Sequence, residues 1–188
     1  MASQAIRQLR WAGGSVPEVF HNAGVKETNS QSFIKGDLVT IVPGTGTVSE
    51  YVVNGINIGG IALDNATNVT TGNIAIRIQK IMKDQVFIAN VTNGATATEV
   101  TAITQLGKCY GLYTSAAGVW KVDVGNSTSS NCRVKVIGFV EGTDIDADGN
   151  PYTKAIGDAA GEVYIKFLSS DGVGTDAATN DQILEFDA

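Results

Sequence analysis

Apolar and polar residues alternate along several short stretches of the chain, and each stretch predicts a β-strand. In residues 73–79, NIAIRIQ, three isoleucines alternate with small or polar residues, which is the period-two pattern of a half-buried strand. Residues 119–124 place Trp120, Val122 and Val124 on one face in the same way. The same alternation, or a strand-like composition, occurs in residues 132–136, 163–167, 37–42, 49–53, 58–63, 86–91 and 99–103.

Tight-turn dipeptides lie between these segments. Asn54-Gly55 and Asn93-Gly94 favour two-residue hairpin turns, because both central positions of such a turn need positive φ. Many short strands separated by turns indicate an antiparallel sandwich or a small barrel. No segment shows a sustained helical period, so we expect an all-β fold.

The two ends of the chain differ from its middle. Residues 1–32 carry basic and apolar anchors without a regular period, and we interpret them as an extended N-terminal arm. Residues 33–168 are the expected β domain, and residues 169–188 form an acidic C-terminal tail that contains an apolar patch. Exposed apolar clusters usually mark interaction surfaces. We therefore expect both ends to dock, either on a partner or on the chain's own barrel.

The charge of the chain disfavours some partners, and the lack of a signal peptide or membrane span predicts a compartment. The net charge is −6, and residues 95–188 carry 13 acidic against 6 basic side chains. An acidic chain has no electrostatic reason to bind nucleic acid or an anionic membrane. The first residues lack the apolar core of a signal peptide, and no apolar run approaches the roughly 18–20 residues that span a bilayer. We expect the protein to be made and left in the cytosol, with Cys109 and Cys132 as free thiols and not as a disulfide.

Patterns that carry catalysis or bind cofactors are sparse. The single histidine, His21, lies in the arm, and two cysteines with 22 residues between them give no zinc-binding spacing. The glycine-rich residues 44–47 are not followed by the Gly-Lys-Ser/Thr of a phosphate loop. We therefore expect no catalytic residue, no cofactor and no metal site, and the protein is not expected to be an enzyme.

The acidic segment 144–151, DIDADGNP, partly matches a calcium loop. Asp144, Asp146, Asp148 and Gly149 occupy the first, third, fifth and sixth positions of that loop. The twelfth position, which needs a bidentate glutamate, is Ala155, and no helices are expected on either side. We interpret the segment as an acidic loop between two strands, with weak calcium binding as the alternative.

A series of strand motifs follows in a familiar order. They are KGDLVT at 35–40, GIALDNA at 60–66, VFIANV at 86–91, GKCYGLY at 107–113, GVWKVD at 118–123, RVKVIGF at 133–139 and GEVYIKFL at 161–168. In order and spacing, over roughly residues 33–168, they resemble the capsid decoration, or cement, proteins of tailed bacteriophages.

The resemblance implies a structural virion protein. It implies a β-rich body on the outer surface of the phage head, with terminal arms that reach across neighbouring subunits of the major capsid protein, and no catalytic residues. Because symmetric self-association is common, we expect a homo-oligomer, either a dimer or a trimer. The residues expected to contact the capsid or a sister subunit are Arg7, Arg10, Trp11, Val19, Phe20, Ile183, Leu184 and Phe186.

Two other classes of protein share this composition. A phage tail-tube or other tail structural protein has similar β patterns but polymerises on its own. A carbohydrate-binding adhesin needs exposed aromatic side chains or a firm metal site. Trp120 lies on an apolar strand face, and we interpret it as a core residue and not as a sugar platform.

Overall fold

A computed structural model describes most of the central part of the chain. It describes residues 10–14, 19–20, 26–27, 30–42, 47–53, 55, 58–66, 75–82, 84–94, 100–114, 119–141, 155–159 and 161–168. These residues form strands and two short 3-10 helices, η1 (Ile103–Gln105) and η2 (Ser129–Asn131). The expectation of an all-β fold with a small barrel is therefore confirmed.

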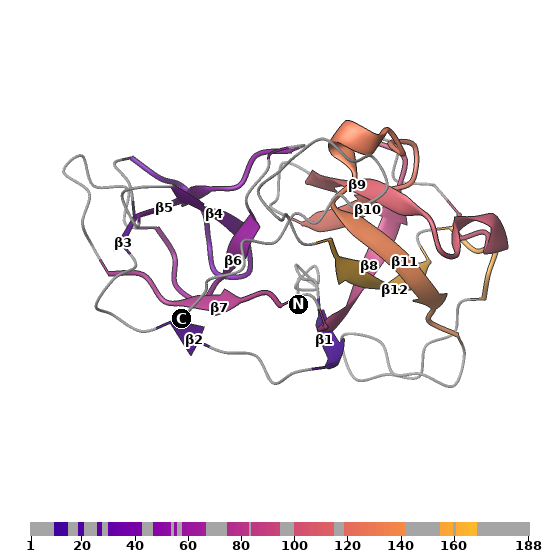
Figure 1. Ribbon diagram of the computed structural model, residues 1–188, viewed down its shortest axis with the longest axis horizontal. Helices are drawn as coiled ribbons and strands as arrows, with labels where there is room; N and C mark the ends of the chain where they lie inside the picture. The colour runs from indigo at the N-terminus through magenta and orange to yellow at the C-terminus, as the bar shows by residue number, and fades with distance from the viewer. Residues whose placement is uncertain are drawn as a thin grey trace, which may run out of the picture.

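The larger unit is a closed barrel of five strands, which lies beside a smaller sheet (Figure 1). Around the barrel the order is β8 (Val86–Thr92), β10 (Trp120–Asp123), β9 (Cys109–Thr114), β11 (Val134–Phe139) and β12 (Glu162–Phe167), and β12 pairs with β8 to close it. β8 and β10 run parallel, whereas the other neighbours in the barrel are antiparallel. The barrel is therefore mixed.

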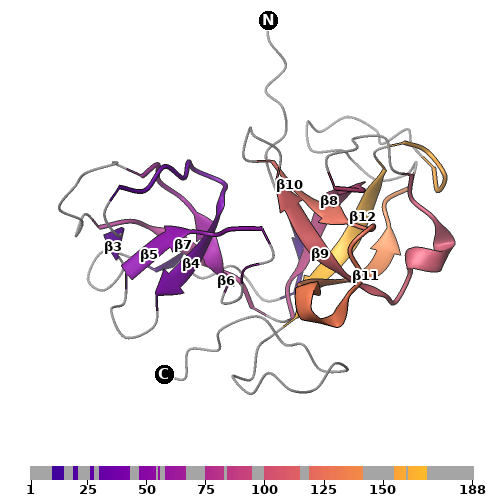
Figure 2. The same ribbon diagram turned by 90° about the horizontal axis from the view of Figure 1, so that it is seen from above.

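The smaller sheet is built mainly from the first half of the chain. Its order is β2 (Val19–Phe20), β7 (Ile78–Lys80), β6 (Ile58–Ala62), β4 (Leu38–Val42), β5 (Thr47–Glu50) and β3 (Lys26–Glu27). Figure 2, which views the molecule from above, again places this sheet beside the barrel. The division of the chain into residues 1–32, 33–168 and 169–188 stays a prediction.

Most of the predicted strands are present, but three segments behave differently from the prediction. Of residues 73–79, only Ile78 and Gln79 lie in a strand, β7, and residues 73–74 lie outside the described residues. Glu50 ends β5, and the side chains of Val52 and Val53 beyond it are exposed. Residues 99–103 are wrongly predicted as a strand, because Val100 makes only an isolated bridge and Ile103 begins η1. The Gln105 side chain accepts a hydrogen bond from the backbone N–H of Ala102 (3.0 Å) and so closes this turn locally.

Neither of the two predicted turns is followed by a strand that pairs with the strand before it. Gly94 has φ of 55°, as the dipeptide Asn93-Gly94 predicts. β8 and β9 are nevertheless not neighbours, since β10 lies between them, and β4 lies between β5 and β6 in the same way. The simple hairpins expected at these two turns are therefore wrong.

One continuous apolar core joins the two sheets. Leu38, Ile58 and Ile61 of the smaller sheet belong to the same buried cluster as Phe87 and Trp120 of the barrel. A second, smaller cluster lies within the smaller sheet alone; its buried members are Phe33, Val39, Ile41, Val48, Ala62, Ile76 and Ile78. Because burial of apolar surface is the main favourable term in folding, the shared cluster holds the two sheets as one body.

The N-terminal strands cross from the barrel to the smaller sheet. In β1 (Arg10–Gly13), Arg10 pairs with Ile88 of the barrel, and in β2, Phe20 pairs with Ile78 of the smaller sheet. Both pairings are antiparallel, and a bulge shifts the register of β1 between Trp11 and Gly13. We call β1 and β2 together the N-terminal strap, because they lie along the chain segment that links the two sheets (Figure 1).

A glycine allows the close approach of the strap. Gly14 has φ of 88°, and a Cβ atom built on it would lie 2.2 Å from the carbonyl oxygen of Asp84. An L-residue at this position meets both a strained backbone and a backbone clash. The adjacent Gly13 has nothing within 4 Å of its own Cβ position.

Substitution of Gly14 by alanine is expected to destabilise the protein. We expect Gly14→Ala to lower the free energy of unfolding by about 2 kcal/mol, since the strap must move away from Asp84. The control Gly13→Ala is expected to stay within about 0.5 kcal/mol of the parent. Urea unfolding followed by tryptophan fluorescence measures both, and equal stability of the two variants would contradict the role of Gly14.

Candidate interaction surfaces

The structure places half of the expected capsid-contact residues in the N-terminal strap. Arg10 and Trp11 lie in β1, and Val19 and Phe20 lie in β2. Their backbones pair within the chain, with β8 and β7 respectively. The strap therefore docks on the chain's own sheets, which is one of the two alternatives left open by the sequence. The remaining expected contacts, Arg7, Ile183, Leu184 and Phe186, lie outside the described residues.

A polar contact inside the shared core joins the two sheets. Arg133 is 1% exposed, and its guanidinium donates hydrogen bonds to the backbone carbonyls of Gly55, Ser130 (3.0 Å) and Cys132 (2.7 Å). Gly55 follows β5 of the smaller sheet, whereas the other two carbonyls belong to the turn that precedes β11. A buried charge is tolerated when its donors are satisfied, so Arg133 fixes the position of one sheet on the other.

Tyr51 and Trp120 pack beside this arginine. Their ring centroids are 5.1 Å apart with the planes tilted by 52°, and the Tyr51 hydroxyl donates a hydrogen bond to the Gly55 carbonyl (2.7 Å). Burial raises the pKa of Tyr51 to about 12, although the nearby Arg133 charge acts in the opposite direction. We call Tyr51, Gly55, Trp120 and Arg133 the sheet junction.

The environment of Trp120 confirms its interpretation as a core residue. Its side chain is 4% exposed, and its indole N–H has no hydrogen-bond partner among the residues that the structure describes. A sugar-binding platform needs an exposed aromatic face. Trp120 therefore offers no support for an adhesin.

Exposed apolar side chains gather around η1, at the end of the barrel that faces away from the smaller sheet (Figures 1 and 2). Ile103 is 62% exposed and Leu106 is 46% exposed. Hydrogen bonds from Gly107 N–H to the Val136 carbonyl (2.8 Å) and from Gly157 N–H to the Thr101 carbonyl (2.9 Å) bring three chain segments together here. The exposed apolar residues of these segments, which we call the η1 surface, are Val100, Ile103, Leu106, Ile137 and Ile156.

The η1 surface is not predicted from the sequence. Residues 99–103 are predicted as a strand, and the two-residue period of a strand hides the three-residue spacing of Ile103 and Leu106. A 3-10 helix has three residues per turn, so Ile103 and Leu106 lie on the same side of η1, whereas Val100 precedes the helix, beyond the extended Ala102. Exposed apolar groups that gather on one surface mark protein contact surfaces.

The described residues hold few groups with the chemistry of a reactive site. Within them, no three His, Cys, Asp or Glu side chains lie together as a metal site. Cys109 and Cys132 are free thiols, as expected, and burial raises the pKa of each. A raised pKa leaves little thiolate at neutral pH, and thiolate is the nucleophilic form. His21 and the acidic segment 144–151 lie outside the described residues.

The carboxylate of Asp64 is already engaged. Arg77 donates hydrogen bonds to it, with a shortest N–O distance of 2.6 Å, and these bonds lower the pKa of Asp64 to about 2. Because both side chains are largely solvated, the pair closes the loop between β6 and β7 and contributes little to stability.

No protein-family model matches the sequence, and no curated protein sequence matches it either. No helix formed by the described residues is long and apolar enough to cross a membrane.

The buried phenol predicts a loss of stability at alkaline pH. Below pH 10 Tyr51 is neutral in the folded and unfolded states; between pH 10 and 12 only the unfolded state ionises, so the free energy of unfolding falls as pH rises. In urea titrations we expect the stability difference between the parent and Tyr51→Phe to shrink by about 1 kcal/mol from pH 9 to pH 11. A pH-independent difference would show that the phenol is not buried at the junction.

Proposed function

We propose that this chain is a structural virion protein, a capsid decoration or cement protein. It binds the outer face of a phage head as a small homo-oligomer and clamps neighbouring subunits of the major capsid protein. The order of strand motifs along residues 33–168 and the all-β body support this proposal. The observation that carries it is the η1 surface, an exposed apolar area at one end of a rigid two-sheet body.

Clamping requires a body that does not deform and a contact area that excludes water. The continuous core and the sheet junction supply the first requirement, because separation of the sheets would expose apolar side chains and the Arg133 charge. The η1 surface supplies the second. Many copies on one shell hold together through multivalency even when each contact is weak.

Polar substitutions on the η1 surface are expected to weaken binding to capsids. We expect the double variant Ile103→Ser, Leu106→Ser to bind capsids assembled without this chain about 100-fold more weakly, since each apolar side chain buried in a contact contributes about 1.5 kcal/mol or more. Both side chains are exposed in the free protein, so the melting temperature should hardly change. Co-sedimentation with the capsids measures the binding.

Val52→Ser is the matched control for this experiment. Val52 is 66% exposed but lies after β5 of the smaller sheet, away from η1. Equal binding by the parent, the double variant and the control would remove the η1 surface from the proposal. If no version of the protein bound capsids, and the purified chain formed tubes in electron micrographs, a tail-tube protein would replace the decoration protein.

The arm is tested by a deletion that spares the strap. Deletion of residues 2–9 leaves β1 and β2 in place, whereas a longer deletion removes strands that pair with both sheets. We expect the shorter deletion to weaken capsid binding, since Arg7 is an expected contact, and to leave the free energy of unfolding within about 0.5 kcal/mol of the parent. Undiminished binding would show that residues 2–9 are not part of the contact.

A further inference from the structure

Two lysines lie directly opposite each other on neighbouring strands of the barrel, and neither has an acidic partner among the described residues. Lys135 of β11 is opposite Lys166 of β12, and on its other side it is opposite Cys109 of β9. We call Lys135 and Lys166 the lysine row.

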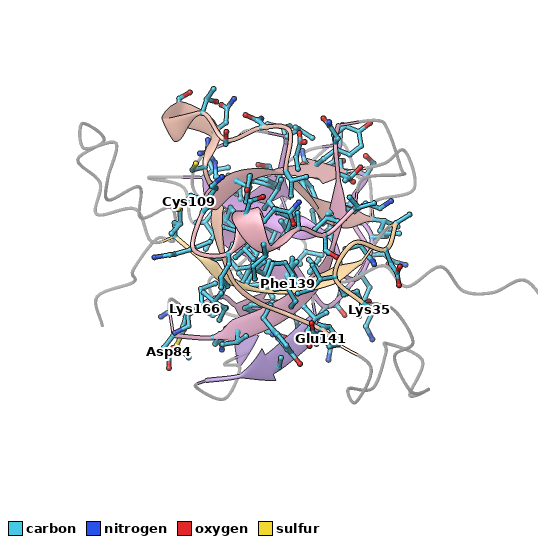
Figure 3. The ribbon with its side chains drawn as sticks, turned by 90° about the vertical axis from the view of Figure 1, so that its right-hand side faces the viewer. Lys35, Asp84, Cys109, Phe139, Glu141 and Lys166 are labelled. Atoms are coloured by element: carbon cyan, nitrogen blue, oxygen red, sulfur yellow. The ribbon has the colours of Figure 1, made fainter. Side chains whose placement is uncertain are left out.

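The lysine row faces outward because of strand alternation. Val134 and Val136 on either side of Lys135 are fully buried, as are Ile165 and Phe167 on either side of Lys166. In the end-on view of Figure 3, Lys166 and Cys109 lie along the same side of the barrel. Asp84 lies near Lys166 in this view, but neither lysine of the row forms an ion pair with any described residue.

Like charges directly opposite each other on a sheet are destabilising. The arrangement is notable in a chain with 19 acidic and 13 basic side chains, because the excess of carboxylates could have supplied partners. The facing lysines are explained if carboxylates of another chain segment lie against them in the folded protein.

We propose that the acidic residues 169–188 of the same chain dock on the lysine row. This segment contains Asp171, Asp176, Asp181, Glu185 and Asp187 and no basic residue. It follows β12 directly, and Leu168 N–H donates a hydrogen bond to the Arg133 carbonyl (3.0 Å), only two residues before Lys135. The segment therefore starts beside the row. Direct covalent connection gives it an effective concentration of the order of millimolar, which favours it over the same segment of a second copy.

The inference rests on the described barrel and not on the proposed capsid binding.

Carbodiimide cross-linking tests the docking, because it joins a lysine to a carboxylate that is in contact with it. The experiment uses the full chain, as a mixture of unlabelled and ¹⁵N-labelled protein. We expect cross-links from Lys135 or Lys166 to residues 171–187 within single isotopic species, identified by mass spectrometry. The links should weaken in about 1 M salt, where the Debye length falls to about 3 Å. They should also become weaker in the variant Asp171→Asn, Asp176→Asn, Asp181→Asn, which removes three of the five carboxylates.

Lys35 is the matched control lysine, because it is exposed and belongs to the turn before β4 of the smaller sheet. Links to Lys35 as frequent as those to the lysine row would overturn the proposal, as would links found only between differently labelled chains, which indicate a second copy. Absence of any link would also overturn it.

As an independent measurement, Lys166→Ser should lower the melting temperature of the parent but raise that of the triple Asn variant, where the repulsion between the lysines outweighs their attraction to the two remaining carboxylates. The same sign in both backgrounds would contradict docking.

Discussion

The buried contact of Arg133 with the carbonyl of Gly55 is the constraint on which the two-sheet body depends. A guanidinium that is 1% exposed is stable only while its donors are satisfied, and one of its acceptors belongs to the smaller sheet. Apolar packing alone would allow the sheets to slide, because it has little directional preference. The hydrogen bond, together with the Tyr51–Trp120 ring contact, selects one arrangement.

The N-terminal strap strengthens the same constraint from outside the core. β1 and β2 pair with β8 and β7, so the strap lies beside the connection between β7 and β8, where the chain passes from the smaller sheet to the barrel. Bending between the sheets must then disturb two chain segments and the close approach at Gly14. The arm expected from sequence is thus, in its described strands, a structural part of the body.

The strands could largely be predicted from the sequence, whereas their neighbours could not. Alternation of apolar and polar residues reflects which face of a strand is buried, and it located β8, β10, β11 and β12 well. Turn dipeptides report only local φ, so they suggested hairpins where β10 and β4 are in fact inserted between consecutive strands. The sheet junction joins Gly55 to Arg133, 78 residues apart, and nothing in the local pattern of either residue indicates the contact.

A surface can be recognised from sequence only when its residues share a local period. Ile103 and Leu106 of the η1 surface have such a period, but Ile137 and Ile156 join them only through the pairing of distant segments. The lysine row likewise requires the register of β11 and β12. The two features place apolar contact area and positive charge on a barrel whose core is shared with the second sheet. Force applied at either surface is therefore transmitted to the smaller sheet through the shared core, the sheet junction and the strap, which is the mechanical property that the proposed clamp requires.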